Sequence, residues 1–279
     1  MMRKTVLLLT VCMLTGCAQH PEKDAPAAFA VRTVQTGAEL TCAAADMLMQ
    51  TETALELAVP EPLLQETEQR IAAAVQGHVL ARTLLDTVTW TRQENRLYLS
   101  AVYTDLPETV REKKQALSAY AEDWAESTAD FPAAVQALLA HDRLCAACCY
   151  DADAPDCGSA YGAWMNGRAS CAGYAEGYAL LLESAGIPVR ILAGTVQLPD
   201  GRALPHAWNL VYLDGSWYHT DCTWDDTADA DGHAMFLCDD AAIADTHAWN
   251  PADCPQAAGG VLRYETVVQQ MQEAVRQDP

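Results

Sequence analysis

The chain has 279 residues, of which 51% are hydrophobic, and it carries 38 acidic against 17 basic side chains, a formal net charge of −21. This length and apolar content allow one large globular domain or two small ones. Such an acidic surface repels polyanions, and no basic stretch is interleaved with aromatic residues, so we do not expect nucleic acid as a partner.

The N-terminus has the composition of a secretory signal. Residues 1–4 are positively charged, residues 5–14 are almost wholly apolar, and small residues follow. The apolar run is too short to span a bilayer comfortably. Leu14-Thr15-Gly16-Cys17 resembles a bacterial lipobox, which implies lipidation of Cys17; a plain secretory signal is the alternative. We therefore expect a signal peptide at residues 1–16 and an extracytoplasmic protein of the cell envelope, held at the membrane by its N-terminal lipid.

The next part of the chain predicts a tether followed by a small α+β region. Residues 17–39 are rich in Ala, Pro, Gln and Thr without an apolar period, which is typical of a linker. Apolar spacing predicts helices over 40–49, 63–85 and 109–127, and alternation predicts a strand over 96–103. Residues 40–130 thus form the N-terminal region, in which no chemistry is evident.

Residues 131–279 are the predicted catalytic domain. We expect a helix over 131–147, a cysteine-rich loop, and a helix that follows Ser170 and runs to about residue 184, where Gly186 and Pro188 stop it. Strands are expected over 189–196, 203–213 and 216–224. The last two flank Asp214-Gly215, a strong hairpin signal.

Cysteine usage favours disulfides. Of the 11 cysteines, Cys12 leaves with the signal, Cys17 is the lipidation candidate and Cys171 is the candidate nucleophile. The other eight form an even set in an exported protein. We expect one or two bridges within residues 145–157 and one between Cys238 and Cys254. A zinc site around Cys145-x-x-Cys148-Cys149 is the alternative, but the second paired motif of a zinc ribbon is missing, so no metal or cofactor is predicted.

Cys171 lies in the first turn of its predicted helix. Unpaired N–H groups and the helix dipole favour a thiolate there, and a thiolate is the attacking species in acyl transfer. Gly167 and Gly173 bracket it, and we expect them to let a substrate backbone approach closely. The alternative is a buried structural cysteine.

The predicted hairpin places a histidine beside a carboxylate. With a two-residue turn at Asp214-Gly215, the numbers of facing residues add to 429, so Trp208 faces Asp221. His206 is then a diagonal neighbour of Asp221 on the same face, roughly 7 to 8 Å away. A carboxylate that orients an imidazole is the third member that a Cys-His pair requires. His219, nearer the turn, is the second choice as base.

These motifs, taken in order, resemble the core of the transglutaminase-like superfamily. The resemblance covers about residues 134–255 and rests on segments 168–176, 180–190, 206–209, 214–221 and 223–226. It also takes in segments 141–144 and 150–151 upstream, and Met235-Phe236-Leu237, Asp239-Asp240, His247 and Trp249 downstream. It implies a papain-like α+β fold, with the nucleophile helix packed on an antiparallel sheet. Transglutaminases, peptidases and peptide N-glycanases of this superfamily all cleave or exchange an amide-type bond through a thioester.

The resemblance also implies residue roles. Cys171 is the nucleophile, His206 the base and Asp221 the residue that orients His206, while the Cys171 backbone N–H meets the oxyanion. Many bacterial relatives carry Gln where this chain has Ala172, so the second oxyanion donor stays open. Tyr161 and Trp164 are candidates for that role. The predicted substrate-binding residues are Trp208, Tyr174, Tyr161 and Trp164.

The sequence therefore predicts an extracytoplasmic, lipid-anchored cysteine-dependent acyl-transfer enzyme. Its substrate would be a protein or peptide, with cell-wall peptides suggested by the location. Hydrolysis of a peptide bond and exchange of a glutamine amide both stay open. The alternative from a different class is a non-catalytic cell-surface binding module that uses the same core as a scaffold.

Overall fold

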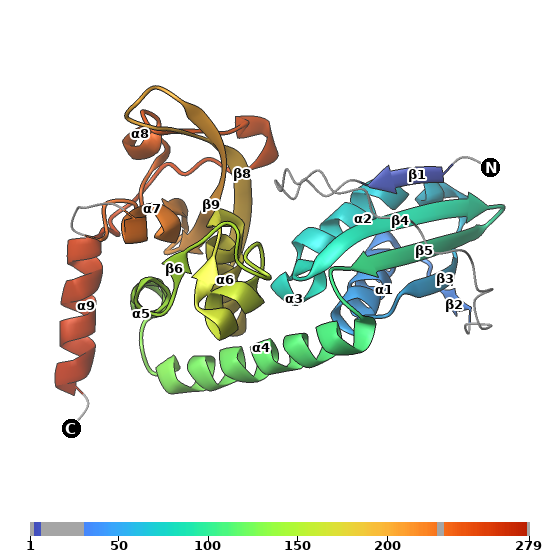
Figure 1. Ribbon diagram of the computed structural model, residues 1–279, viewed down its shortest axis with the longest axis horizontal. Coiled ribbons are helices and arrows are strands. Elements are labelled where there is room, and N and C mark those ends of the chain that lie inside the picture. The colour runs from blue at the N-terminus through green and yellow to red at the C-terminus, as the bar shows by residue number, and fades with distance from the viewer. Residues whose placement is uncertain (1–2, 7–30, 228–231, 278–279) are drawn as a thin grey trace. The chain divides into compact units, whose positions relative to one another are not determined.

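The computed structural model describes residues 3–6, 31–227 and 232–277 (Figure 1). The chain divides into two compact units, Met1–Glu112 and Lys113–Pro279. Residues 7–14 of the predicted apolar run and the predicted lipidation site Cys17 lie outside the described residues. Among the described residues, no helix combines the length and the apolar character that crossing a membrane requires.

The N-terminal unit is built on a five-stranded sheet with strand order β1-β4-β5-β3-β2. Only the β2–β3 pair is parallel. The helices pack on one another and lie behind the strands in the view of Figure 1. The elements are β1 (Arg3–Val6), β2 (Arg32–Thr33), α1 (Gly37–Met49), β3 (Ala54–Ala58), a 3-10 helix (Glu61–Gln65), α2 (Thr67–Gln76), α3 (Val79–Arg82), β4 (Leu85–Gln93) and β5 (Arg96–Tyr103).

Two predictions for this unit were wrong in part. The tether ends earlier than expected, because Arg32–Thr33 pairs with β3 and α1 begins at Gly37, where the Thr36 hydroxyl accepts the Glu39 N–H at 3.2 Å. The single helix over 63–85 is three short helices, since the chain is extended at His78. The strand over 96–103 is confirmed as β5.

The division between the units falls inside α4 (Pro107–Thr128), ahead of the boundary predicted after residue 130. The later turns of α4 belong to the C-terminal unit through their own contacts. Lys113 forms an ion pair with Asp156 at 2.7 Å, and Trp124 is buried. Because a helix is continuous, its composition gives no signal for such a division.

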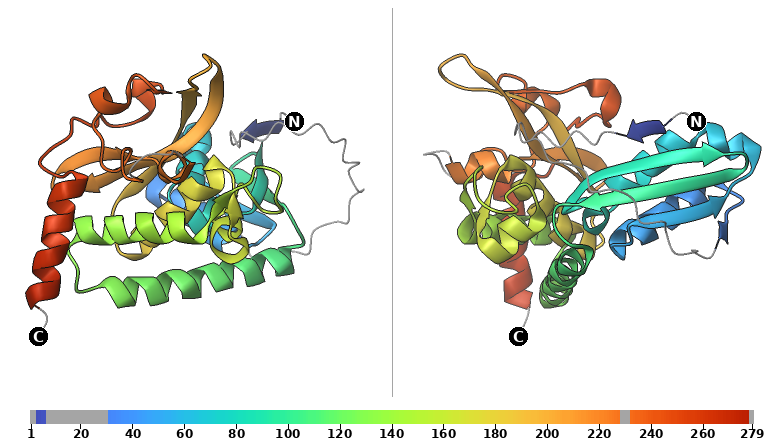
Figure 2. Two further views of the ribbon diagram at one scale, coloured as in Figure 1. Left: turned by 60° about the vertical axis from the view of Figure 1, so that its left-hand side comes forward. Right: turned by 45° about the vertical axis from the view of Figure 1, so that its right-hand side comes forward.

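The C-terminal unit has a four-stranded antiparallel sheet of order β10-β9-β8-β11, on which α6 packs (Figure 2). Helix α6 is apolar almost all round, as expected of a helix enclosed by its neighbours. The elements are α5 (Ala133–Ala147), β6 (Cys149–Tyr150), a π-helical turn (Gly162–Asn166), β7 (Arg168–Ala169), α6 (Cys171–Ser184), β8 (Val189–Gln197), β9 (Ala203–Leu213), β10 (Ser216–Thr220), α7 (Cys222–Thr227), α8 (Asp240–Ile243), β11 (His247–Ala248), a 3-10 helix (Pro251–Asp253) and α9 (Tyr264–Gln277).

The register of the β9–β10 hairpin is as predicted, from Ser216 opposite Leu213 to Thr220 opposite Asn209. The predicted strand over 216–224 is wrong beyond Thr220, where α7 replaces it. The Asp221 carboxylate caps this helix, because its Oδ1 accepts the backbone N–H of Trp224 at 3.1 Å.

The cysteines of the described residues are all free thiols. The bridges predicted within residues 145–157 and between Cys238 and Cys254 are therefore absent from the structure. Cys238 and Cys254 contribute apolar surface to the cluster formed by Trp208, Leu210 and Ile243.

Candidate active site

Cys171 is the first residue of α6, and its side chain is partly exposed. Ser170 occupies the N-cap position with an extended backbone, but its side chain does not cap the helix. Its hydroxyl donates to the Cys157 carbonyl at 3.2 Å, and its backbone N–H donates to the same carbonyl at 2.9 Å. The first N–H groups of α6 thus have no side-chain cap competing with the Cys171 sulfur.

Gly173 has a different role from the one predicted. A Cβ at this position would lie 2.2 Å from the Cys157 carbonyl oxygen and 2.8 Å from the Ala169 Cβ. The absence of a side chain therefore lets the chain's own loop, rather than a substrate, approach the first turn of α6. Gly167 ends the preceding π-helical turn in a left-handed conformation, with φ of 65°.

His206 and Asp221 meet as the hairpin arithmetic predicted. The His206 Nε2 lies 2.6 Å from Asp221 Oδ2, and both side chains are buried. Their mutual hydrogen bond and opposite charges outweigh burial, so that the pKa of Asp221 falls to about 2 and that of His206 rises to about 9. Since Nε2 faces Asp221, Nδ1 is the ring nitrogen left to exchange a proton with the nucleophile.

The pKa of the Cys171 thiol is lowered by this histidine. Burial raises the pKa of Cys171, but the hydrogen bond with His206, the charge of that ring and the Ala207 backbone N–H lower it by more, so the net pKa lies below the usual range. The structure thus brings Cys171, His206 and Asp221 together in the order that a cysteine triad requires. An imidazolium and a thiolate stabilise each other in this arrangement.

Residues 108–222, which include these three side chains, match the family described as the transglutaminase-like superfamily. They form a transglutaminase-like domain. The expected α+β fold with its nucleophile helix on an antiparallel sheet is confirmed. The match and the assembled triad support a cysteine-dependent enzyme.

Two solved structures are similar at low identity. One is described as a candidate cysteine protease from Cytophaga hutchinsonii and matches at 13% identity and a TM-score of 0.35, over 61% of this chain and 68% of that one. The other is described as a TGase and matches at 15% identity and a TM-score of 0.30, over 61% of this chain and 50% of that one. The chain thus matches half the length of that second protein. No curated protein matches the chain.

A second histidine of the C-terminal unit contacts the triad carboxylate. His247 Nε2 lies 3.0 Å from the same Asp221 Oδ2, and its Nδ1 lies 2.8 Å from the Thr246 hydroxyl. The site residues predicted from the sequence did not include it. Its placement depends on the two-residue strand β11, which pairs with β8 and is too short to give an apolar pattern.

Asn209 ties the strand of the base to the helix of the nucleophile. Its side-chain amide, which is buried, donates to the Ala175 carbonyl of α6 at 3.0 Å. Because Asn209 follows His206 on β9, this bond fixes the distance between the two catalytic elements. A buried side-chain bond of this kind holds geometry that apolar packing alone leaves looser.

Three of the four predicted substrate-binding aromatics belong to the core. Trp208 is buried and donates its indole N–H to His219 Nδ1 at 2.9 Å. Tyr174 is buried and donates to Asp226, and Trp164 donates to the Gly177 carbonyl at 2.9 Å. We therefore reassign these three to packing, which also removes Trp164 as an oxyanion donor. Only Tyr161 keeps partial exposure.

His219 does not act as the base. Its Nδ1 accepts from Trp208, and its Nε2 lies 2.9 Å from Asp240 Oδ1, so both ring nitrogens are engaged away from Cys171. The second choice made from the sequence is therefore wrong. The hairpin register explains this result, since His219 pairs with Leu210, deeper toward the turn than His206.

Tyr150 is a further residue that the sequence did not single out for the site. It lies on β6 opposite Ala169, two residues before Cys171, and it is 49% exposed. Burial first, and then the charges of Cys171 and Cys157, raise the pKa of Tyr150. A neutral phenol is therefore carried by the strand that pairs with the residues directly before the nucleophile.

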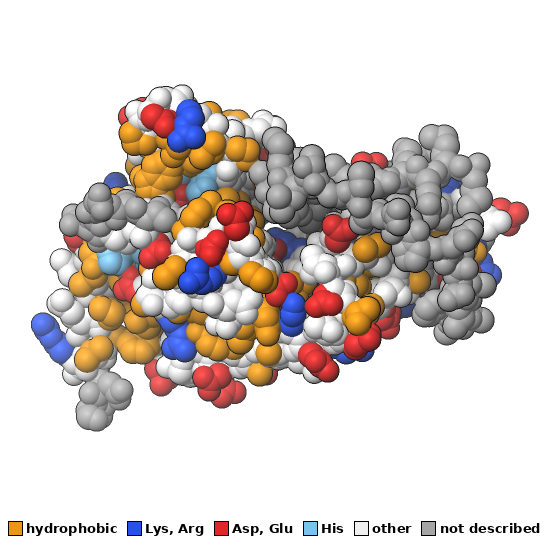
Figure 3. Space-filling view, in the orientation of Figure 1, with side chains coloured by type: hydrophobic (Ala, Val, Ile, Leu, Met, Phe, Trp, Pro, Cys, Tyr) orange, Lys and Arg blue, Asp and Glu red, His pale blue; other side chains and the backbone are white. Residues whose placement is uncertain are grey.

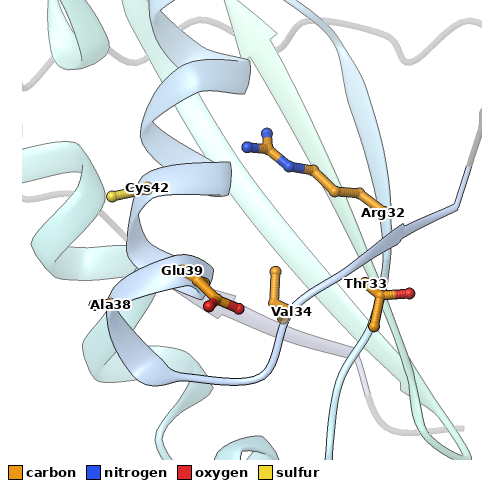
Figure 4. Close-up of a pocket in the computed structure, with 6 residues that line it drawn as sticks. All are labelled: Arg32, Thr33, Val34, Ala38, Glu39 and Cys42. Carbon is orange, nitrogen blue, oxygen red and sulfur yellow. The ribbon is translucent and has the colours of Figure 1, made fainter.

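Surface features of the described residues outside the triad include a pocket and the distribution of charged side chains. A pocket of the N-terminal unit is lined by residues of β2 and α1 and contains no triad residue (Figure 4). Its Arg32 forms an ion pair with Asp46 at 3.2 Å. On the face drawn in Figure 3, acidic side chains are scattered with basic ones among them.

The described residues include two groups of metal-ligand side chains. Their donor atoms lie within 4.8 Å of one another, and the groups are His206, Asp221 and His247, and His141, Asp142 and His233. The first group is the triad pair with its added histidine, in which hydrogen bonds of 2.6 and 3.0 Å already join the donor atoms. The second group shares no residue with the triad.

Proposed function

We propose that this protein is an extracytoplasmic, lipid-anchored enzyme that cleaves or exchanges an amide bond of a protein or peptide through a thioester on Cys171. The observation that carries the proposal is the joined arrangement of a helix N-terminal thiol with a lowered pKa, a histidine and a buried carboxylate. The N-terminal sequence supports the envelope location, with Cys17 as the lipidated residue.

The residues define a two-step reaction. The Cys171 thiolate attacks the carbonyl carbon of the substrate amide, and a C–S bond forms while the carbonyl oxygen becomes an oxyanion. The Cys171 backbone N–H meets that oxyanion. When the C–N bond breaks, protonated His206 gives its proton to the departing amine, which leaves a thioester and a neutral imidazole.

The second step restores the enzyme. A water molecule or a second amine attacks the thioester carbonyl, and His206 takes a proton from it as the C–S bond breaks. Water yields a carboxylate and therefore hydrolysis, whereas an amine yields a new amide and therefore exchange. Asp221 stays ionised throughout, because its two histidine contacts hold its pKa at about 2, below its ordinary value despite its burial.

A brief iodoacetamide pulse at mildly acidic pH tests the triad. Mass spectrometry of the wild type should show fast labelling of Cys171, and His206→Ala should slow it by at least about 10-fold, because the thiolate loses its imidazolium partner. His78→Ala, at an exposed histidine of the N-terminal unit, is the matched control and should label as the wild type does.

The labelling must be read peptide by peptide. Cys145 is a second thiol with a pKa lowered to about 6, through its hydrogen bond with Cys222 and its proximity to His141, so it should also label quickly. The triad is ruled out, and the binding-module alternative is favoured, if Cys171 labels at the rate of ordinary thiols or if His206→Ala leaves its labelling rate unchanged. Incubation with a glutamine-containing peptide and a labelled amine then distinguishes cleavage from exchange.

A further inference from the structure

A second cluster of histidines and carboxylates lies in the C-terminal unit, outside the triad. His141 and Asp142 stand near the middle of α5, and His233 belongs to the segment that follows α7. Asp142 Oδ1 lies 3.0 Å from His141 Nδ1 and 2.7 Å from His233 Nε2. Residues almost a hundred positions apart thus direct two imidazoles at one carboxylate oxygen.

The other nitrogen of His141 is held by a buried carboxylate. His141 Nε2 lies 3.1 Å from Asp225 Oδ2, and both side chains are 1% exposed. The remaining oxygen of Asp225 accepts the Met235 N–H at 2.9 Å, so this carboxylate is fixed. A carboxylate behind a histidine is the support that metal-bound histidines usually have, because it places the proton on the far nitrogen and leaves the near one as a ligand.

The position between His141 Nδ1 and Asp142 suits a cation, which is a proton when His141 is doubly protonated and a metal ion when the ring carries its only proton on Nε2. With its proton on Nε2, His141 turns the Nδ1 lone pair toward the Asp142 oxygen at 3.0 Å. Two acceptors at that distance repel each other unless a proton or a metal ion lies between them. A third possible metal ligand, His233 Nε2, lies within 4.8 Å of both of these atoms.

The third of these side chains, His233, is held in place by aromatic packing. The His233 ring stacks on Tyr264 of α9, with centroids 4.0 Å apart, and meets Phe236 edge-on. The side chains of His233 and Asp142 are 19% and 48% exposed. His233 and Asp142 are thus the more exposed members of this cluster, while His141 and Asp225 form its buried base.

We propose that His141 Nδ1, the Asp142 carboxylate and His233 Nε2 bind one divalent transition-metal ion of the zinc class. Two imidazoles and one carboxylate are a ligand set that suits such ions and that leaves a fourth position for water. Neighbouring ligand atoms around tetrahedral zinc are about 3.3 Å apart, given bonds of about 2.0 Å, so a small opening of the present contacts accommodates the ion.

The site is structural rather than part of the thioester chemistry. It joins α5 to the segment after α7, and α7 itself begins at the triad carboxylate Asp221. Cys145 is not a ligand, because its sulfur lies 4.0 Å from His141 Nε2, the nitrogen on the side of Asp225. The bound ion would hold the end of α7 and thereby the position of Asp221.

Cobalt(II) titration of the purified, reduced full-length chain tests the site. One Co²⁺ per chain should bind and give visible d–d absorption without the near-ultraviolet sulfur-to-cobalt charge transfer that cysteine sites give. His233→Gln should weaken binding by at least about 10-fold, and Zn²⁺ should displace the Co²⁺. His78→Gln, at an exposed histidine outside the cluster, should bind as the wild type does.

Asp142→Asn is the second variant, because its half-exposed side chain makes misfolding a poor explanation for lost binding. It should also bind Co²⁺ at least about 10-fold more weakly, with an unchanged far-ultraviolet circular dichroism spectrum. The proposal is overturned by absence of binding, by sulfur-to-cobalt bands, or by equal affinity in both cluster variants. Absence of binding would mean that only a proton occupies the position between His141 and Asp142.

Discussion

At the scale of single residues, Cys171 and His206 shift each other toward a thiolate and an imidazolium. The pKa of His206 rises from 6.5 to about 9, chiefly because Asp221 and then Cys171 outweigh its burial, while the pKa of Cys171 falls. The ion pair therefore exists above the lowered pKa of Cys171 and below about pH 9. The contact of protonated His206 with Asp221 stabilises the fold fully below pH 6.5, and this contribution is lost as pH rises through about 9.

Turnover should follow that window. We expect the rate of peptide cleavage or amine exchange to fall above about pH 9, because neutral His206 no longer protonates the departing amine. Alkylation of Cys171 should already be fast in mildly acidic solution. The pH profiles of turnover and of alkylation measure both. An alkylation rate that rises only near pH 8.5, as for an ordinary thiol, contradicts the ion pair.

Tyr150 offers a second residue-scale prediction. Its pKa is raised, partly by the charge of Cys171, and its strand partner Ala169 precedes Cys171 by two residues, so we expect the phenol to donate to the oxyanion in the place that Ala172 leaves open. Loss of one such donor costs about 10² to 10³ in kcat in a known case, and for an exposed phenol we expect Tyr150→Phe to cost about 10-fold or more, with KM little changed. Tyr212→Phe, at another partly exposed tyrosine, is the control. Equal kcat for Tyr150→Phe and the wild type would exclude this role.

At the scale of elements, the loop that ends at Ser159 is fitted against the first turn of α6. Gly173 makes this fit, since a Cβ there would lie 2.2 Å from a backbone oxygen that cannot rotate away. That carbonyl, of Cys157, also accepts both donors of Ser170, directly before the nucleophile. A change at Gly173 therefore moves Cys171 through the backbone.

Gly173→Ala should destabilise the protein by about 1 to 3 kcal/mol, as overpacking does, and should slow alkylation of Cys171 as well. Gly158→Ala is the matched control in the same loop, because nothing lies within 4 Å of its added Cβ and its φ is not positive. Urea unfolding and the iodoacetamide pulse measure the two effects. Equal stability of the two variants would contradict this prediction, because it would mean that the loop at Cys157 moves away from the added Cβ at little cost in free energy.

The hairpin was predictable because a two-residue turn permits only one register between its two strands. Asp214 and Gly215 have φ of 49° and 83°, as that turn requires, and the pairing runs as expected to Thr220. The strand end was not predictable, because Asp221 can continue a strand or cap a helix, and the choice depends on α7 packing against α5 and α6. The same carboxylate serves the triad in either case, which is why His206 and Asp221 still meet.

At the scale of the whole molecule, the features that could be predicted from the sequence are those that produce a periodic pattern or an ordered series of motifs. The α+β class, α6, the hairpin and the three triad residues follow from local patterns. The contact of His233 with Asp142 does not, since His233 lies in a loop that carries no pattern. The resemblance covers His247, but it assigns this residue no role at the site, and the contact of His247 with Asp221 depends on the very short strand β11. The position of the division inside α4 was equally hidden, because it depends on contacts such as Lys113 with Asp156.

The expected maturation has a structural consequence for the N-terminal unit. Strand β1 pairs with β4 at the edge of the sheet, and cleavage before Cys17 would remove it. The remaining order β4-β5-β3-β2 keeps every pairing made by residues beyond the signal. Cleavage also removes Arg3 and Lys4 and no acidic residue, which leaves 15 basic against 38 acidic side chains and a formal charge of −23.

We expect a mature protein that begins at lipidated Cys17 and fractionates with membranes. In a bacterial host, processing should be sensitive to globomycin, and a palmitate analogue should label the wild type. Cys17→Ser should abolish both the label and the cleavage, because the thiol that accepts the lipid is gone. Cys12→Ser, which changes another cysteine of the same segment, should be processed normally. Intact mass and N-terminal sequencing decide the matter, and a mature N-terminus at any other residue contradicts the lipid anchor.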